Sequence, residues 1–284
     1  MMNYRTDLTL ELTEAAGETP GVHSDCRTVE GVKVTRTVID SSEAAARIGK
    51  PQGEYFTLEM LPFSDSAFEP EHCFEAASDI LTEMLPRHGG VLAVGLGNEG
   101  ITPDALGPKA AGRILATRHI SGELAEKCGL APLRETAVIA PGVLGQTGIE
   151  AAETVKCLCA ALQPAAVIVI DAMAARSLSR LGCTLQISDS GISPGAGVGN
   201  NRPQIDSATL GTKVISLGVP TVVEMRTAIA DLNGEAAAVR VSSSMIVTPR
   251  EIDLLTDRAA RFIADAVNAA LQPHLHPSEI EKLF

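Results

Sequence analysis

The chain has 284 residues, 45% of them hydrophobic, which is enough for one large domain or at most two. Its 23 basic and 35 acidic residues give a formal net charge of -12 with no basic run, so we do not expect a surface that binds nucleic-acid phosphates. Aromatic residues make up only 3%, so the core must consist of Ala, Val, Ile and Leu, and aromatic platforms for stacking bases are not expected.

The amino-terminal residues carry neither a basic segment nor an apolar one, so the sequence predicts a cytoplasmic protein without a secretory signal. The most hydrophobic stretch, residues 165–175, contains Asp171 and is far shorter than the ~20 apolar residues of a membrane span. We expect a buried strand there and no contact with a membrane. The six cysteines are scattered, which favours free and mostly buried thiols.

The first 65 residues show the alternation of apolar and polar side chains that is typical of strands. Three strands are predicted, over Thr6–Leu12, Val32–Val38 and Tyr55–Leu61. From Glu71 to Pro86 the apolar residues instead recur at helical spacing. No linker separates the two parts, so residues 1–284 are expected to form a single domain, with a β-rich part (8–65) and an α/β core (66–284).

Strands and helices then alternate along the core, as in a parallel α/β sheet. Short apolar runs typical of buried strands occupy Val91–Gly95, Thr136–Ala140, Ala166–Ile170, Thr184–Ile187 and Lys213–Leu217. Helices are predicted from Pro108 to about Thr117, from Gly148 to Leu162 after a Thr147/Glu150 capping box, and after the Thr248 cap and Pro249.

The segment Gly95–Gly100 matches G-x-G-x-x-G directly after a strand, a pattern that indicates dinucleotide binding in some folds. The following Thr-Pro-Asp argues against that interpretation, because it interrupts the helix start and puts a carboxylate where phosphates would lie. No acidic residue ends a strand about twenty residues later. We therefore expect no bound cofactor.

Asp104 follows the first buried strand of the core, and Asp171 follows the apolar run Val-Ile-Val-Ile. Ligands of open α/β sheets bind beyond the carboxyl ends of the strands, so the two carboxylates converge if these strands are neighbours. Two facing Asp residues share a proton, and one can then activate a water while the other donates, as in an aspartic peptidase. The alternative is that both residues only cap or form turns.

Converging acids can also bind a metal ion, for which His119 is the nearest candidate for a third ligand. A lone His at that place is more often a surface or capping residue. A further candidate is the loop from Ser188 to Arg202, in which Gly195, Gly197 and Gly199 alternate. That spacing permits close approach of a ligand to the backbone, but it also suits a flexible flap or an ordinary bend.

Nine unusual strings occur in an order that resembles the germination proteases of endospore-forming bacteria, over most of the chain: RTDLTLE, IGKPQGEYFTLE, VGLGNEGITPDALGPKA, TRHI, IAPGVLGQTGIE, VIVIDAMAARS, LQISDSGISPGAGVGN, LGVPTVVE and MIVTPREID. The resemblance implies an atypical aspartic endopeptidase that degrades small acid-soluble spore proteins early in germination. Its two catalytic acids correspond to Asp104 in TPDAL and Asp171 in IDAMA.

The resemblance also implies a fold like that of the hydrogenase-maturation peptidases, a three-layer α/β/α sandwich with a mostly parallel, mixed sheet and here a β-rich amino-terminal extension. In those relatives the corresponding acids bind metal, so a metal-dependent peptidase is the alternative. The family is made as a homotetrameric zymogen that removes its own amino-terminal segment, which here would be residues 1–7, and it acts in the forespore. Family members carry a long insertion where this chain has only residues 225–244.

Overall fold

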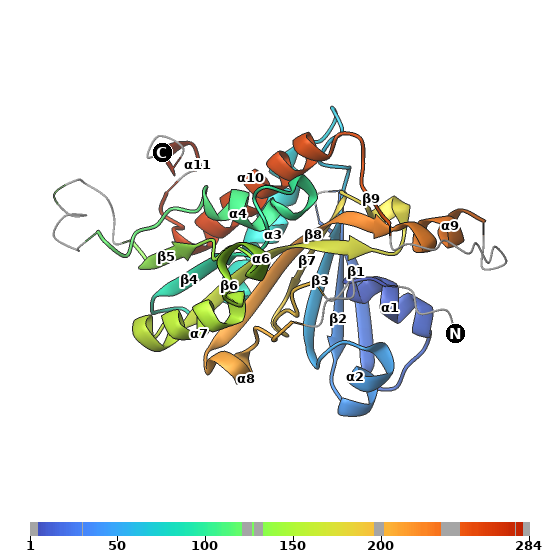
Figure 1. Cartoon of the computed structure of the whole chain (residues 1–284), viewed down its shortest axis with the longest axis horizontal. Helices are drawn as coiled ribbons and strands as arrows, with labels where there is room; N and C mark the ends of the chain where they lie inside the picture. The colour runs from blue at the N-terminus through green and yellow to red at the C-terminus, as the bar shows by residue number, and fades with distance from the viewer. Residues whose placement is uncertain are drawn as a thin grey trace.

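A nine-stranded mixed sheet is the middle layer of the computed structural model, which describes residues 5–29, 31–120, 127, 133–195, 202–233, 245–275 and 277–280 (Figure 1). Along the sheet the strands follow the order β1-β2-β3-β7-β8-β6-β4-β5, and β9 pairs with β8. Because β3 pairs with β7, the β-rich amino-terminal part continues the sheet of the core.

One half of the sheet is parallel and the other half antiparallel. The parallel strands are β4 (Val91–Gly95), β5 (Thr136–Ile139), β6 (Ala166–Ala175) and β8 (Lys213–Glu224). The antiparallel strands are β1 (Val22–Val29), β2 (Val32–Ile39), β3 (Gly53–Glu59), β7 (Thr184–Ser188) and β9 (Ile246–Val247). All the strands predicted in the core are present, and β6 and β8 extend several residues beyond their predicted carboxyl ends.

Helices pack on the first face of the sheet, against every second residue of its strands. Ile168 and Ile170 of β6 point to this face, as does Leu185 of β7, and they share one buried cluster with helix residues. The helices above them are α3 (Pro70–Met84), α4 (Leu106–Ala111) and α10 (Ile252–Leu271) (Figure 1). The apolar stripe predicted for the last helix therefore packs in the core, as expected.

The second face is covered in two separate places. Val167 and Val169 of β6 pack under α7 (Ala151–Leu162) and α8 (Ser207–Leu210). At the other end of the sheet, Ile39 and Tyr55 pack under α1 (Thr9–Ala16) and α2 (Ser42–Ile48) (Figure 1). The predicted three-layer α/β/α sandwich with a mixed sheet is thus confirmed, and a polar stretch of the sheet lies between the two groups of helices. The remaining short helices are α6 (Leu144–Thr147), α9 (Met225–Asn233) and α11 (Pro277–Ile280).

Four local predictions are wrong. The helix predicted from Pro108 to about Thr117 is α4, which spans only Leu106–Ala111. The predicted strand Thr6–Leu12 is wrong, because its last four residues belong to the helix α1 (Thr9–Ala16). Two of the alternating apolar residues, Leu8 and Leu10, are instead buried at the start of that helix. The capping box of α7 joins Glu150 and Glu153, so that helix begins later than predicted. The Thr248 hydroxyl donates to Thr221 O, 3.0 Å away, and does not cap α10.

The described cysteines are free thiols. Cys73, Cys159 and Cys183 are buried, whereas Cys26 and Cys157 are exposed, and Cys128 lies outside the described residues. Within the described part of the chain, no helix has the length and apolar character needed to cross a membrane.

Candidate active site

Close packing of backbone against glycine positions Asp104. Gly97, just after β4, has φ +119°, and a Cβ there would lie 2.0 Å from the carbonyl oxygen of Asp104. A Cβ on Gly107 would lie 2.1 Å from Leu96 O and 2.5 Å from Ile170 O. The protein's own backbone therefore occupies the space beside Gly97 and Gly107, so these two glycines serve close packing.

Asp104 ends a short 3₁₀ helix (Thr102–Asp104) and is half-buried. Its Oδ2 accepts the Asn98 N–H at 2.8 Å. Burial raises the pKa of Asp104 above its ordinary value, whereas the Asn98 hydrogen bond and the Arg202 guanidinium act in the opposite direction. The competition leaves Asp104 the less perturbed acid of the pair.

Asp171 lies inside β6 and not at its end as predicted. It follows Val167 and Val169 at every second position, so its side chain is on the second face, and it is only 6% exposed. Its Oδ1 accepts the Ala172 N–H at 2.9 Å. Burial, followed by the carboxylates of Asp104 and Asp7, holds the pKa of Asp171 well above its ordinary value. Asp171 therefore keeps its proton to a higher pH than an exposed Asp does.

The two acids line one cavity of about 500 Å³. They converge there because β4 and β6 are parallel neighbours, as the strand-end argument expected, although their catalytic role stays a prediction. An ion pair between Arg202 and Glu150, 3.2 Å apart, lies in the same wall. The rest of the wall includes three exposed apolar side chains: Ile101, Leu144 and Ile246.

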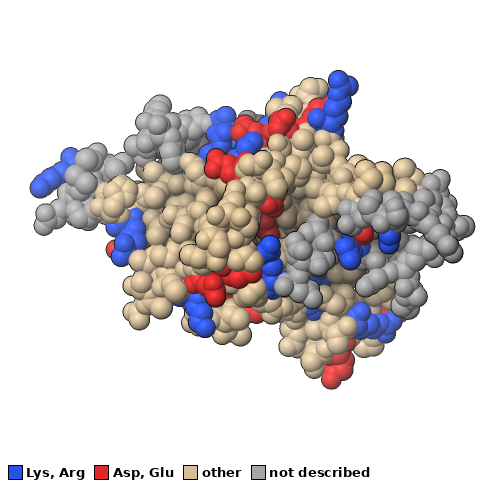
Figure 2. Space-filling model, viewed as in Figure 1, with Lys and Arg blue, Asp and Glu red and all other residues tan. Residues whose placement is uncertain are grey.

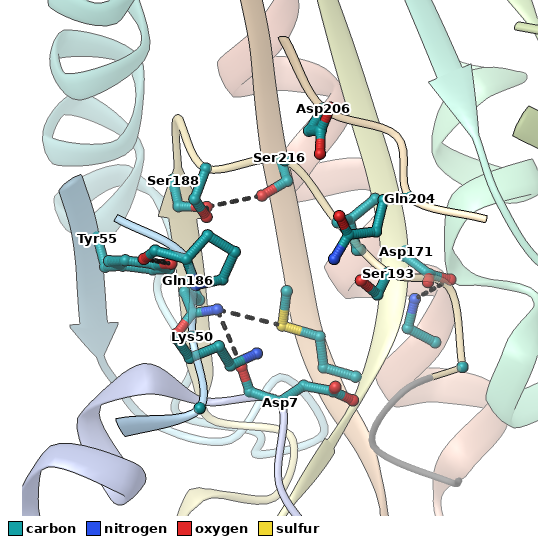
Figure 3. A pocket seen from close by; sticks show the side chains of 18 residues that line it. Asp7, Lys50, Tyr55, Asp171, Gln186, Ser188, Ser193, Gln204, Asp206 and Ser216 are labelled. Atoms are coloured by element: carbon teal, nitrogen blue, oxygen red, sulfur yellow. Dashed lines mark hydrogen bonds between the residues drawn. The ribbon is translucent and has the colours of Figure 1, made fainter. Parts of the chain in front are cut away.

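A second cavity, of about 130 Å³, shares Asp7 and Asp171 with the first (Figure 3). It lies over the polar stretch of the second face. Gln186 and Ser188 of β7 point into it, and the hydroxyls of Ser188 and Ser216 lie 2.9 Å apart. The alternation Thr-Leu-Gln-Ile-Ser in β7 is the signal that could have identified Gln186 and Ser188, because polar residues there replace the expected apolar ones.

The chain's own amino-terminal segment occupies the edge of β6 at this place. The Asp7 N–H donates to Ala174 O at 2.8 Å, and the Ala174 N–H donates to Asp7 Oδ2 at 2.9 Å. β4 no longer pairs with β6 there, since the last link is Leu96 N–H to Ile170 O, at 2.8 Å. Sequence reasoning placed Asp7 at a processing boundary but not in the site.

Lys50 provides positive charge in the second cavity. It lies between α2 and β3, and its side-chain nitrogen points toward Asp7 in Figure 3. Burial lowers the pKa of Lys50, and the carboxylate of Asp7 opposes that shift. The amino-terminal segment therefore places the Asp7 carboxyl group on the side of the cavity where Lys50 lies.

Among the residues that the structure describes, the acids do not have the third ligand that the metal interpretation requires. Thr117 N–H and Arg118 N–H, next to His119, donate to Thr136 O at the amino end of β5, the end of the parallel strands opposite to Asp171. No three His, Cys, Asp or Glu side chains of the described residues are grouped to hold a metal ion. Of the glycine loop, Gly195 lines both cavities, while Gly197 and Gly199 lie outside the described residues.

Charges are mixed on the face seen in Figure 2. Lys and Arg side chains are scattered among Asp and Glu and do not gather in one area of that face. This distribution agrees with the net charge of -12 and offers no continuous track for a phosphate backbone on this side.

The sequence model of the family described as germination protease matches residues 3–233. A germination protease of Caldanaerobacter subterraneus subsp. tengcongensis is 38% identical over 321 aligned positions, covering 100% of this chain and 99% of the relative. One of Clostridium perfringens is 37% identical over 326 positions, covering 100% of both. One of Priestia megaterium is 40% identical, covering 78% of this chain and 64% of the relative.

Among solved structures, the [NiFe] hydrogenase maturation protease HycI of Thermococcus kodakarensis KOD1 aligns with a TM-score of 0.41 and 18% identity, over 68% of this chain and 98% of that one. From the family match and the full-length relatives, the chain belongs to the germination protease family of peptidases.

Proposed function

We propose that this protein is an endopeptidase in which Asp104 and Asp171 together activate a water molecule for peptide hydrolysis. The observation that carries the proposal is that both carboxyl groups line one cavity, where burial and then the carboxylate of Asp104 raise the pKa of Asp171. Two acids with such different surroundings can divide the roles of base and acid. A pair that served only as caps and turns would not need a buried, protonated member.

The two acids take different roles. Asp171 holds a proton and is the acid, while Asp104, beside the Asn98 N–H and Arg202, is the base. As water attacks the carbonyl carbon, Asp104 takes a proton and Asp171 donates one to the carbonyl oxygen, which forms a neutral gem-diol. When the C–N bond breaks, Asp171 regains its proton from a gem-diol hydroxyl, and Asp104 passes its proton to the leaving nitrogen.

The edge of β6 beyond the end of β4, which the amino-terminal segment occupies in this structure, is the place where a substrate binds as an extended strand. Beyond the end of β4, the backbone groups of Ala172 and Ala174 face this edge, and Asp7 already pairs with Ala174 there. Addition of a strand to a sheet edge recognises the backbone of a polypeptide and not one particular side chain. A substrate in this position passes directly over Asp171.

The resemblance to the family supplies the biological assignment. We propose that the substrates are small acid-soluble spore proteins, that cleavage starts their degradation at germination, and that the enzyme works in the forespore and spore core as a homotetramer. It captures these proteins as polypeptides, without binding nucleic acid itself, and it uses no cofactor. The metal-dependent alternative is less well supported, because the two acids lack a third ligand among the described residues.

The full-length protein is expected to cleave a purified small acid-soluble spore protein at a few internal bonds. The rate is expected to be unchanged after exhaustive chelation, because the acids and the water need no metal. Product masses from a time course measure both. A rate that falls with chelation and returns with a divalent ion would support the metal-dependent alternative, and intact substrate at all times would contradict the proposal.

The protein is also expected to remove its own residues 1–7. The Asp7–Leu8 bond adjoins a side chain that lines both cavities with Asp171, and the fully buried Leu8 would keep its place after the cut. Mass spectrometry of the purified chain, incubated under acidic or dehydrating conditions, should find a form that begins at Leu8. A chain that stays full length under these conditions would contradict self-processing.

A further inference from the structure

Gln186 makes contacts at the active site that the mechanism above does not use. It lies on β7, is only 3% exposed, and directs its side-chain amide toward the amino-terminal segment (Figure 3). Its Oε1 accepts the Thr9 N–H at 2.7 Å, and its Nε2 donates to Asp7 O at 3.2 Å. One amide therefore contacts the backbone on both sides of Leu8.

The orientation of this amide is fixed by chemistry. A backbone N–H can only donate, so the Gln186 atom that faces Thr9 must be the oxygen. The nitrogen is then directed to the Asp7 carbonyl, with Met173 Sδ as a weak further acceptor at 3.9 Å. Thr9 belongs to α1 and stays in place after residues 1–7 leave. Its N–H still fixes the Gln186 oxygen, so the Gln186 Nε2–H remains directed at the same place.

The acceptor of that hydrogen bond is the carbonyl of the Asp7–Leu8 bond. Asp7 and Asp171 line the same two cavities, and in Figure 3 Asp7 lies at the bottom of the view, below Gln186 and Asp171. Attack by water places negative charge on that carbonyl oxygen in the transition state. A buried, preoriented N–H donor stabilises such charge more than it stabilises the ground state.

We propose that Gln186 is a catalytic residue whose Nε2–H holds the carbonyl oxygen of the bond to be cut, first in the chain's own Asp7–Leu8 bond and then in polypeptide substrates. This inference rests on the proposed function and adds to it the group that binds the reacting carbonyl. Asp171 protonates that oxygen, and Gln186 orients the carbonyl and stabilises its charge.

The decisive variant is Gln186→Glu in the full chain. Glutamate keeps an oxygen for the Thr9 N–H but presents a second oxygen, not a donor, to the carbonyl. Self-cleavage at Asp7–Leu8, and kcat for an added peptide with the sequence of residues 3–12, are expected to fall about 10²-fold with little change in KM. Because a protonated Glu again donates, the deficit is expected to shrink as the pH is lowered. The unfolding temperature of the variant is measured at the same pH values, because a residue that only supports the fold would recover stability and activity together, whereas a catalytic donor changes kcat at an unchanged unfolding temperature.

Gln272→Glu is the matched control. Gln272 is also 3% exposed, and its amide also bonds one backbone twice, through Arg134 N at 3.0 Å and Arg134 O at 2.9 Å. It should retain wild-type cleavage. Gln186→Met, uncharged and similar in length, should lose activity at every pH and serves if the Glu variant does not fold. A kcat for Gln186→Glu within twofold of wild type would overturn the inference, whereas a wild-type protein that cleaves neither bond would mean that the proposed function itself has failed.

Discussion

Asp104→Asn and Asp171→Asn are each expected to lower kcat for a spore-protein substrate by about 10³-fold or more. An amide at position 104 cannot take a proton from water, and an amide at position 171 cannot give one to the carbonyl oxygen. The two groups act on the same water and carbonyl, so the double variant should be little worse than either single one. Single-turnover cleavage of a purified substrate measures the loss.

Asp171→Asn should not lower the stability of the fold at neutral pH. Asp171 is buried with a raised pKa, so the folded state binds more protons than the unfolded state once the pH exceeds the ordinary pKa of an Asp. Its ionisation therefore removes stability as the pH rises from that value through the raised pKa. Asp171→Asn does not ionise and keeps an oxygen for the Ala172 N–H. Its unfolding temperature at neutral pH should equal or exceed that of wild type.

The pH dependence of cleavage reports the same division of roles. Activity should fall at low pH as Asp104 is protonated and at high pH as Asp171 loses its proton, which gives a bell-shaped profile. Asp265→Asn is the control, because Asp265 is also an acid with a raised pKa but lies on α10 beside Arg261. Near-normal cleavage by Asp104→Asn or Asp171→Asn would contradict the proposed mechanism.

Much of the central sheet could be predicted because its strands are buried on both faces. A run such as Val91–Gly95 has no polar interruption, so its bounds coincide with those of β4. The two acids could be singled out for the same reason, since each follows such a run. The length of β6 could not be predicted, because Asp171 interrupts the apolar pattern although the strand continues to Ala175. What keeps it extended is pairing with β8, which no local pattern encodes.

The remainder of the site depends on contacts between distant parts of the chain. The alternating residues of Thr6–Leu12 indicated a strand, but Thr9–Ala16 form a helix that meets β7 through the Gln186 amide. Gln186 itself is separated from Asp7 by 179 positions along the chain. The only sequence signal for Gln186 is that a polar residue stands at a buried position of β7. Sequence patterns therefore predicted the acids but not the polar surface and the segment that position a substrate over them.

Gly107→Ala is expected to lower the free energy of unfolding by about 3 kcal/mol or more and to abolish cleavage. The added Cβ would lie 2.1 Å from Leu96 O, just after β4, and 2.5 Å from Ile170 O, inside β6, and both are backbone atoms. Backbone cannot rotate away as a flexible side chain does, so α4 must move off the sheet and carry the adjoining Asp104 with it. Denaturant unfolding and substrate cleavage measure the two effects.

Gly145→Ala is the matched control, since Gly145 also lies in a helix, α6, but its Cβ would have no atom within 4 Å. There Ala should stabilise the protein slightly, by about 0.5–1 kcal/mol, because it restricts the unfolded chain more than Gly does. A Gly107→Ala protein that keeps wild-type stability and activity would mean that the approach of α4 to the strand ends is not required. A variant that folds stably but does not cleave would mean that the close packing at Gly107 positions Asp104 relative to Asp171. A loss of stability alone cannot explain inactivity in a protein that is folded.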